Sequence, residues 1–510
     1  MKNYFLLFFM VVCFVLKLNG QVYVKHDATG ANNGTSWVNA YTDLQMALDS
    51  GFSAQIWVAA GNYYPQSDTS GNYSPVDPRT KTFHDPDKLH RRIYGGFAGW
   101  ENSLTQRDFS SNVTVIDGNI GNTNETSDNV YHLFYINRQG NKIFDHLSFI
   151  NGNASGIDTS QMSGGAIYAD SSFISFEYCE FRDNHAVLRG GGIFATQCYA
   201  YRLVDCVGNN NFCDENGGFS YSEYSEVSFK NSHFRGNKAD HNGGAVYIAN
   251  HGKKGTPSTY FHFQIGNCII ENNFAADTGG AVYSANLNYH TYNNNIFKLN
   301  ESNFASSIFM SSPNQFADSR IYNTTMAYNT NTGGNIISEN LRLFIINSIL
   351  WENNIEIVNI GLNPIPSIRN SIKPGPLTSL EILNAVLNKD PLFVNAPADL
   401  NVSLSSRAIN GGTSSGQVPT SDLLGQARPQ SGGYDIGAYE YSLPLSYEFN
   451  GPGDDWYDGA NWNTGFNPPN RYNGAIMIHS NCIKPELPLR MLAPGTLFID
   501  ENVSFLVKKM

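Results

Sequence analysis

The stretch GGAIYADSSFISFEYCEFRDN, residues 164–184, decides the fold because versions of it recur along the chain. Its Gly-Gly pair returns at positions 191, 217, 243, 279 and 333, and Ser306-Ser307 fills the one gap, so that the steps are 27, 26, 26, 36, 27 and 27 residues. An asparagine recurs at the same pace, as Asn184, Asn211, Asn237, Asn273, Asn300, Asn329 and Asn353. Self-similarity at such a period is typical of stacked repeats.

The residues between these markers also align. A small side chain lies five positions before each asparagine: Cys179, Cys206, Ser232, Cys268, Asn295, Thr324 and Ser348. An apolar residue lies three positions earlier (Phe176, Leu203, Phe229, Ile265, Tyr292, Ile321 and Ile345), and a polar column runs just ahead of the small one, beginning with Tyr178 and Asp205. Short apolar runs between Gly and Asn indicate strands and turns.

A unit of about 27 residues with three short strands cannot enclose a core alone, so it has to stack on its neighbours. Parallel stacking places equivalent residues about 4.8 Å apart, and asparagine suits such a ladder because its amide both donates and accepts and it tolerates left-handed turns. Gly-Gly permits a tight corner where a Cβ would clash. The L-x-x-L-x-L pattern of leucine-rich repeats is absent, and propeller blades are longer. The pattern therefore predicts an all-β parallel β-helix.

The ends of the solenoid should differ from its middle, because terminal repeats need caps. Residues 37–50 have one apolar face and predict an amphipathic capping helix just ahead of a first strand at residues 55–60. Residues 65–90 predict a long polar loop, and residues 91–101 and 114–118 further irregular turns. The long step contains a polar insert, residues 251–259, which we interpret as a loop grown from one turn.

Composition excludes several classes of protein. Hydrophobic residues make up 41% of the 510 residues and aromatics 13%, which excludes wholesale disorder. Charged residues are only 15%, and abundant Gly and aromatics argue against a helical protein. A formal net charge of −12 leaves no electrostatic footprint for nucleic acid.

Residues 1–20 predict a signal peptide, with Lys2 before an apolar run that is shorter than a membrane span needs. We expect no membrane-spanning segment after its removal and a secreted, extracellular or outer-membrane-surface location in a bacterium. The remaining cysteines show no metal spacing, so we expect no metal and no cofactor. Cys179, Cys206 and Cys268 share the small column and are expected to be buried thiols, although the disulfide state of Cys179 and Cys206 stays open.

Two sets of motifs resemble known families. The turns Gly164-Gly-Ala-Ile167, Gly243-Gly-Ala-Val246 and Gly279-Gly-Ala-Val282, with the tetrapeptides Phe181-Arg-Asp-Asn184, Phe234-Arg-Gly-Asn237 and Phe297-Lys-Leu-Asn300, resemble repeats of chlamydial polymorphic outer-membrane proteins and of secreted right-handed β-helix proteins. The pieces Asp390-Pro-Leu-Phe-Val394, Ser406-Arg-Ala-Ile-Asn410, Asp422-Leu-Leu-Gly425 and Asp435-Ile-Gly-Ala-Tyr-Glu440 resemble a choice-of-anchor closing segment. The first resemblance implies a right-handed helix and a surface protein, the second a cap.

These patterns divide the chain into a signal peptide (1–20), a cap with irregular β-helix turns (21–160), regular repeats (161–386), a closing cap (387–445) and a small β-rich module (446–510). In the module, residues 475–479 and 496–499 are expected to be strands. No sorting domain is recognisable before Met510, and whether the C-terminus is complete stays open. We expect Asp435 and Glu440 to serve turn hydrogen bonds in the cap and not catalysis.

Two functional hypotheses remain. The first is a non-catalytic surface protein that adheres to or recognises a glycan or protein, with a polysaccharide or the surface of a host or neighbouring cell as partner. Its candidate glycan contacts are Tyr199, Tyr201, Tyr221, Tyr224, Tyr260 and Tyr289, which come from successive turns around the insert. The alternative is a polysaccharide lyase or hydrolase, which needs Asp/Glu and Lys/Arg from adjacent turns in one groove. No catalytic set is recognisable in the sequence.

Overall fold

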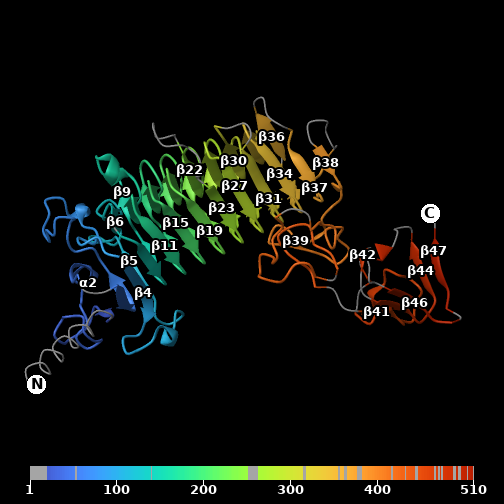
Figure 1. The fold of residues 1–510 in the computed structure, drawn as a ribbon, viewed down its shortest axis with the longest axis horizontal. Coiled ribbons are helices and arrows are strands. Elements are labelled where there is room, and N and C mark those ends of the chain that lie inside the picture. The colour runs from blue at the N-terminus through green and yellow to red at the C-terminus, as the bar shows by residue number, and fades with distance from the viewer. Residues whose placement is uncertain are drawn as a thin grey trace, which may run out of the picture. The chain divides into compact units, whose positions relative to one another are not determined.

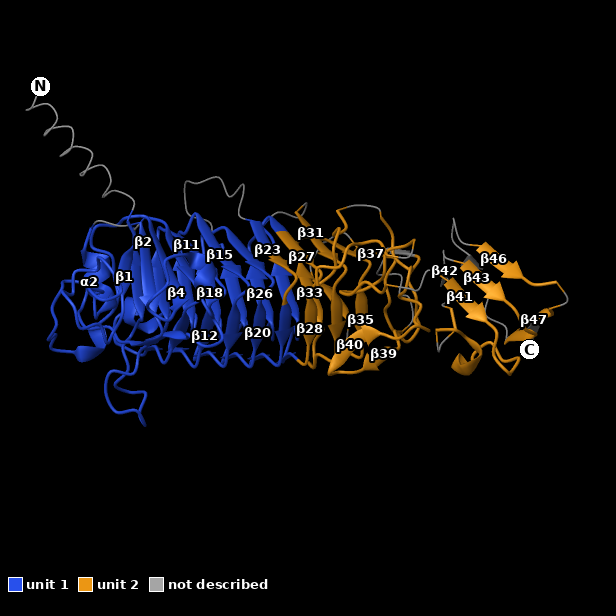
Figure 2. Cartoon of the chain, turned by 90° about the horizontal axis from the view of Figure 1, so that it is seen from below, with its two compact units in different colours: residues 1–264, 269–289, 300–313 blue, residues 265–268, 290–299, 314–510 orange. Residues whose placement is uncertain are grey.

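The structure is a computed structural model, and it describes residues 20–508 apart from 52–53, 139, 251–261, 314–316, 354–355, 361–364, 376–381, 415–416, 431, 443–445, 465–466, 469–470, 473–474, 486–489, 492–495 and 502. The predicted signal peptide and the polar insert therefore lie outside the described residues, except for Gly20. The chain divides into two compact units: residues 1–264, 269–289 and 300–313, and residues 265–268, 290–299 and 314–510 (Figure 2).

The described strands of the first unit form four parallel sheets (Figure 1). Sheet 1 contains β1 (Val22–Val24), β2 (Gln55–Ala59), β4 (Arg91–Phe97), β7 (Lys142–Asp145), β11 (Phe173–Glu177), β15 (Ala200–Val204) and β19 (Val227–Lys230). Sheet 2 contains β6 (Phe134–Asn137), β10 (Ile167–Asp170), β14 (Ile193–Thr196), β18 (Ser220–Glu223), β22 (Val246–Ala249), β26 (Val282–Ala285) and β30 (Ile308–Ser311). Sheet 3 contains β3 (Gly61–Tyr63), β5 (Thr114–Asp117), β8 (Ser148–Ile150), β12 (Glu180–Arg182), β16 (Val207–Asn209), β20 (His233–Arg235) and β24 (Ile269–Glu271). Sheet 4 contains β9 (Asn153–Ala154), β13 (His185–Ala186), β17 (Phe212–Cys213), β21 (Lys238–Ala239), β25 (Phe274–Ala275) and β29 (Glu301–Ser302).

Successive strands of the chain enter different sheets, and each pairs in parallel with its equivalent one turn away. Thus β10, β11, β12 and β13 follow one another, and β11 pairs with β7 on one side and β15 on the other. Such a path is a right-handed parallel β-helix, as predicted. The prediction of three strands per turn was wrong, because the fourth, such as β13, has only two residues and is too short to show a period of two.

The asparagine ladder forms inside the turns. The side-chain amide of Asn211 donates to Oδ1 of Asn237 at 3.0 Å, and Asn237 repeats the bond to Asn273 at the same distance. Each of these asparagines is buried. The left-handed residue is, however, the one before each ladder position, for example Asn210 with φ 53°. The ladder residues are therefore selected for their paired hydrogen bonds and not for turn geometry.

The two glycines of the pairs at 164–165, 190–191, 217–218, 243–244 and 279–280 meet different constraints. The first adopts positive φ, 73° at Gly164 and 69° at Gly243, where a side chain would be strained. The second lies against neighbouring turns: a Cβ on Gly244 would stand 2.1 Å from the carbonyl oxygen of Gly280. The predicted steric reason for the Gly-Gly pair is confirmed.

Aromatic and small side chains fill the interior. Phe144 stacks on Phe176 with ring centroids 4.9 Å apart, and Phe149 stacks on Phe181 at the same distance. The small column is buried as expected, and the cysteines of the described chain are free thiols, which answers the open question on Cys179 and Cys206. Burial raises the pKa of the Cys198 and Cys213 thiols to about 12.

The amino-terminal cap contains a helix that is shorter than predicted. Helix α2 (Leu44–Asp49) begins after Asp43, whose carboxylate accepts the Gln45 N–H at 2.9 Å. Residues before Asp43 are not helical because Tyr41 pairs with Val24 in a parallel bridge. The predicted order was also wrong, since β1 precedes the helix and pairs with β2. The expected irregular turns contain the regular strands β4 and β5, and short 3-10 helices lie at η1 (Pro78–Thr80), η2 (Leu104–Gln106) and η3 (Thr159–Met162).

Strands β23 (His262–Gly266) and β27 (Tyr289–Asn293) are divided between the units. In the second unit, β27 is followed in its parallel sheet by β31 (Asp318–Tyr322), β34 (Arg342–Ile346), β37 (Ser367–Arg369) and β38 (Ile382–Asn384). Further parallel pairs join β28 (Ile296–Lys298), β32 (Thr325–Ala327) and β35 (Ile349–Trp351), and β33 (Ile336–Glu339) with β36 (Ile357–Ile360). An antiparallel pair, β39 (Phe393–Asn395) and β40 (Asp399–Val402), follows.

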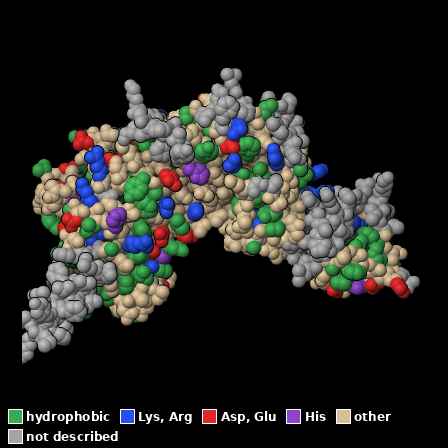
Figure 3. Space-filling model, viewed as in Figure 1, with side chains coloured by type: hydrophobic (Ala, Val, Ile, Leu, Met, Phe, Trp, Pro, Cys, Tyr) green, Lys and Arg blue, Asp and Glu red, His purple; other side chains and the backbone are tan. Residues whose placement is uncertain are grey.

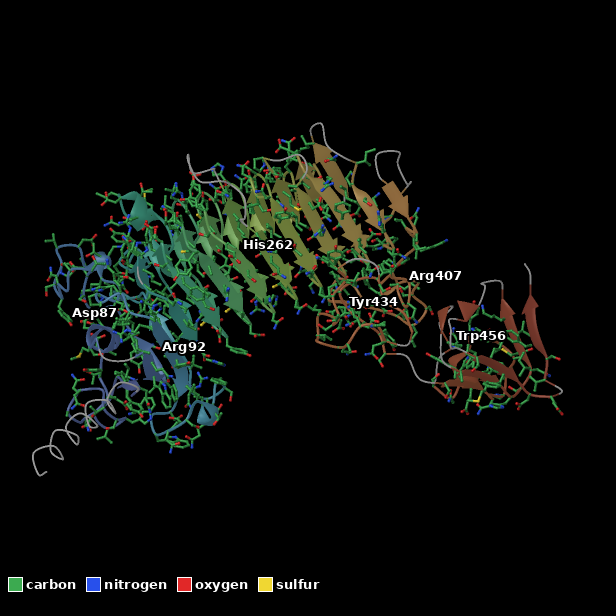
Figure 4. All side chains as sticks on the ribbon, in the orientation of Figure 1. Asp87, Arg92, His262, Arg407, Tyr434 and Trp456 are labelled. Atoms are coloured by element: carbon green, nitrogen blue, oxygen red, sulfur yellow. The ribbon has the colours of Figure 1, made fainter. Side chains whose placement is uncertain are left out.

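The last part of the second unit is a small β-rich module, as predicted. Its strands pair in parallel: β41 (Ser446–Phe449), β43 (Ala475–Ile478) and β46 (Thr496–Ile499); β42 (Arg471–Tyr472) with β45 (Arg490–Met491); and β44 (Cys482–Pro485) with β47 (Phe505–Lys508). A 3-10 helix, η4 (Gly459–Asn461), precedes Trp462. Trp456 is fully buried inside the module (Figure 4). Across the described residues, no helix is long and apolar enough to cross a bilayer.

Candidate functional site: an aromatic ladder and its flanking clefts

An aromatic ladder runs along the outward face of sheet 2. The second residue of each strand is aromatic, and the strands pair in register, so the rings align. The ladder consists of Tyr135, Tyr168, Phe194, Tyr221, Tyr247, Tyr283 and Phe309. Parallel strands in register place these rings at the stacking distance without further adjustment.

Most rings of the ladder cover the faces of their neighbours. Tyr247 stacks on both adjacent rings at 4.6 Å with planes within 7°. Tyr135 stacks on Tyr168 at 4.9 Å, whereas Phe194 is tilted by 43° and 34° against its neighbours. Phe194, Tyr221 and Tyr247 in the middle of the ladder are buried, whereas Tyr135, Tyr168 and Tyr283 are partly exposed. A ligand therefore reaches the ladder more readily at its first end, where Tyr135 lies.

The ladder carries neutral phenols and one guanidinium. Burial raises the pKa of Tyr168 to about 12 and that of Tyr221 further, so both stay protonated at physiological pH. The Tyr221 hydroxyl donates to Glu223 at 3.3 Å. Arg189 lies over the ring of Tyr221 at 5.5 Å and pairs with Glu223 at 3.6 Å. This arrangement covers the middle of the ladder, and Tyr135 at its first end is partly exposed.

Two clefts flank Tyr135. The cleft at the carboxyl end of β6 has a volume of about 480 Å³ and is lined by Thr69, His84, Asp85, Pro86, Lys88, Tyr135, Asn137, Arg138 and Asp170. The cleft at the amino end has about 350 Å³ and is lined by Asp68, Thr69, Ser70, Arg79, Thr80, Thr82, Tyr131, His132, Tyr135, Ser160 and Gln161. The predicted polar loop of residues 65–90 contributes walls to both. The aromatic ring and the polar walls together offer a small polar ligand both an apolar surface and hydrogen-bonding groups.

Buried bonds hold this loop in place. Phe83 adds to the edge of sheet 2, since its N–H donates to the Leu133 carbonyl at 2.9 Å and its carbonyl accepts the Tyr135 N–H at 3.0 Å. The buried carboxylate of Asp85 binds Arg91 at 3.2 Å and Lys142 at 3.1 Å. Asp87, two residues further along this loop, is labelled in Figure 4. The clefts are therefore preformed by the fold.

The polar groups of the clefts do not assemble a hydrolytic pair. Of the two carboxylates that line the larger cleft, Asp85 is held by its two cations and Asp170 accepts the Ser171 hydroxyl at 2.7 Å. In the smaller cleft, burial lowers the pKa of His132 to about 4, so its imidazole is neutral at physiological pH. In the part of the chain that the structure describes, no group of three or more His, Cys, Asp or Glu could hold a metal ion.

A second ring cluster lies beside a smaller cleft at sheet 3. Phe109 stacks on His146 with centroids 3.4 Å apart, and His146 stacks on Tyr178 at 4.6 Å. Tyr178 is 54% exposed and adopts φ 54°, a conformation that later turns assign to asparagine. The cleft has about 260 Å³ and includes Glu180, which accepts the Ser148 hydroxyl at 2.8 Å. This cluster provides an exposed aromatic outside the ladder.

The six tyrosines predicted from the sequence as glycan contacts lie in different environments. Tyr199 and Tyr289 are exposed, at 59% and 46%, and Tyr224 is half-buried, but none belongs to the ladder. Tyr221 is a ladder ring, and Tyr260 lies outside the described residues. Tyr201 has no exposed surface, so it cannot contact a glycan; its hydroxyl bonds to Ser220 inside the core at 2.9 Å.

The acidic side chains of Asp435 and Glu440 bind backbone amides. Asp435 accepts the N–H groups of Asn410 and Tyr441 at 2.6 and 2.7 Å, and Glu440 accepts that of Gln430 at 2.7 Å. Arg428 pairs with Glu440 at 2.8 Å, with both side chains fully buried. These groups have no exposed surface at which a substrate could react, in agreement with the turn hydrogen bonds expected for Asp435 and Glu440.

The ladder corresponds to a sequence pattern that becomes visible only when several turns are aligned. An aromatic residue stands three positions after the second glycine in Gly164-Gly-Ala-Ile-Tyr168, Gly243-Gly-Ala-Val-Tyr247 and Gly279-Gly-Ala-Val-Tyr283. Aligning the turns on the glycines would have placed these rings in one outward column. The clefts had no comparable signal, because part of their walls comes from a loop more than 45 positions before Tyr135.

The comparisons with known proteins give one short match. A model of the Chlamydia polymorphic membrane protein repeat matches residues 267–285. This segment contains the ladder asparagine Asn273, the Gly279-Gly280 corner and the ring of Tyr283. No curated protein matches the chain.

Proposed function

We propose that this chain is an exported bacterial protein of the cell surface or extracellular space that recognises a glycan without catalysing its breakdown. The match to a repeat of polymorphic membrane proteins supports a surface location, and the expected signal peptide supports export. The partner is a polysaccharide or the glycan coat of another cell.

The observation that carries this proposal is the position of Tyr135 between two preformed polar clefts. Sugar rings bind aromatic faces with their C–H groups and polar side chains with their hydroxyls, so a site for them needs both. Tyr135 supplies the face, and neighbouring Asn137, Thr69 and Gln161 supply donors and acceptors. On the face seen in Figure 3, basic and acidic side chains are interspersed among uncharged polar ones, which provides hydrogen-bonding groups for sugar hydroxyls.

The alternative of a lyase or hydrolase has weaker support. A hydrolase needs two carboxylates across the scissile bond, and Asp85 is neutralised by Arg91 and Lys142. A metal-dependent lyase needs a carboxylate cluster, which the described residues do not form. Recognition without bond cleavage therefore accounts best for the groups that line these clefts.

A glycan array probed with the purified protein tests the proposal, followed by titration of the best ligand against variants. Tyr135→Ala should weaken binding about five- to thirtyfold, because a stacked aromatic contact contributes about 1–2 kcal/mol, whereas Tyr135→Phe should retain most of the affinity. Tyr178→Ala, which removes an exposed ring outside the ladder, is the matched control and should bind like the parent protein.

Three results would contradict the proposal: no glycan bound above background, equal binding by Tyr135→Ala, or loss confined to Tyr178→Ala. The same glycans are incubated with the protein, and their reducing ends and the absorbance of unsaturated products are followed. Release of either product, removed by Asp170→Asn, would instead favour the enzymatic alternative.

A further inference from the structure

The larger cleft beside Tyr135 is cationic in an acidic protein. The chain has 32 Lys and Arg against 44 Asp and Glu. Lys88 and Arg138 both line this cleft, and both side chains are exposed. Within the described part of the chain, neither enters an ion pair. Two cations that face a preformed cleft without acidic partners form a local positive potential.

The carboxylates of the cleft do not cancel this potential. Asp85 is bound by Arg91 and Lys142, which are themselves cationic, so that cluster carries an excess positive charge. Asp170 is therefore the one lining carboxylate that offsets Lys88 and Arg138. Counted with their bound partners, the groups around the cleft comprise four cations and two carboxylates. Cations that are fixed around a concave site attract an anionic ligand.

The backbone fixes both cationic residues at the rim. Lys88 has φ 54° and Arg138 has φ 50°, left-handed conformations that most side chains avoid. The Arg138 N–H donates to the Asp170 carbonyl at 2.9 Å, and the Lys88 carbonyl accepts the Gly140 N–H at 2.9 Å. The second bond joins the two loops that carry the cations, and the first ties the Arg138 loop to the next turn, so the two charges lie at the same cleft.

We propose that this cleft binds an acidic sugar residue that carries a carboxylate or a sulfate. This sugar is part of the glycan whose recognition is proposed above, and the inference rests on that proposed function. The sugar ring lies on Tyr135, and its anionic group lies between Lys88 and Arg138. The planar guanidinium of Arg138 matches a carboxylate or sulfate with two parallel hydrogen bonds, and Lys88 adds a point charge. Asn137 accepts and donates to the sugar hydroxyls.

The test compares three oligosaccharides of equal length by isothermal titration: one of uronic acids, one sulfated and one neutral. The parent protein should bind at least one anionic oligosaccharide about tenfold more tightly than the neutral one, with the preference falling as salt rises. The double variant Lys88→Gln/Arg138→Gln should lose about tenfold for that anionic ligand, because each exposed charge pair contributes about two- to fivefold, and should bind the neutral one unchanged.

The control Lys230→Gln/Arg235→Gln makes the same charge change at exposed positions on sheets 1 and 3. It should retain the preference, which separates local recognition from net charge. Equal affinity for neutral and anionic ligands, or equal losses in the two double variants, would overturn the inference and leave glycan recognition standing. Failure of all three ligands together with an empty glycan array would overturn both proposals. Circular dichroism of each variant confirms that it is folded.

Discussion

Replacement of Asn237 by alanine should destabilise the solenoid locally and strongly. The Asn237 side chain makes four hydrogen bonds: its amide donates to the Gly208 carbonyl at 2.9 Å and to Asn273 Oδ1 at 3.0 Å, and its Oδ1 accepts the N–H and the side-chain amide of Asn211, both at 3.0 Å. It is buried, so water cannot replace these partners.

The magnitude follows from these bonds. Each contributes about 1 kcal/mol net, and a buried donor left without an acceptor costs about 1–3 kcal/mol. Asn237→Ala strands two donors of Asn211 and one carbonyl, so we expect a loss of about 4 kcal/mol in the free energy of unfolding. Asn209→Ala, at an outward position of β16, is the matched control and should cost less than about 1 kcal/mol.

Native-state hydrogen exchange is the appropriate assay, because a solenoid loses its turns in parts and a single unfolding midpoint is not well defined. The amide of residue 211, whose acceptor is removed, should lose most protection in Asn237→Ala, while amides several turns away change less. Unchanged protection at residue 211, together with a loss below about 1 kcal/mol in urea unfolding, would refute the role assigned to the ladder.

Three further predictions concern burial and close packing. Burial raises the pKa of Glu356 from 4.5 to about 7, so the contribution of this carboxyl to stability is fully present below pH 4.5 and is lost as pH rises through 7. Glu356→Gln should remove this loss in melting curves and gain about 3 kcal/mol at pH 8, and a pH profile parallel to that of the parent protein would contradict the assignment. Gly244→Ala should lower the free energy of unfolding in urea by about 3 kcal/mol, because its Cβ would stand 2.1 Å from a carbonyl oxygen. Gly266→Ala is the control and should be tolerated, since the nearest atom to its Cβ would be 3.8 Å away. Equal losses in the two variants would be inconsistent with this packing. Because burial raises the pKa of Cys198 to about 12, its thiolate fraction at pH 8 is about 10⁻⁴, and a thiol reagent should react only after unfolding; rapid labelling of the folded protein would disprove this burial.

The repeat was predictable from sequence because its constraints are local. Gly244 and Asn237 each mark a position where one residue type satisfies a contact with the next turn, and such contacts recur with the period of the chain. The two-residue strand β13 was not predictable, since two residues cannot display an alternation. The helix was overextended because an apolar face at residues 37–43 also serves a bridge, between Tyr41 and Val24.

The site was harder to predict. Tyr201 could have been assigned to the core, because it lies two residues before Leu203 on the same strand face, and Leu203 belongs to the apolar column. The cleft around Tyr135 could not, because Lys88 and Arg138 come from loops 50 residues apart that meet through backbone hydrogen bonds and the Asp85–Lys142 ion pair. A solenoid repeats its core but not its insertions, and here the walls of the clefts come from an insertion.

The most direct test of the central claim is a crystal structure of the protein with the oligosaccharide selected on the array. A sugar ring should lie stacked on Tyr135 with its polar groups in the adjoining clefts, and no sugar should lie at Tyr178. A ligand bound at Tyr178 or at another face, with the clefts beside Tyr135 free of sugar, would contradict it.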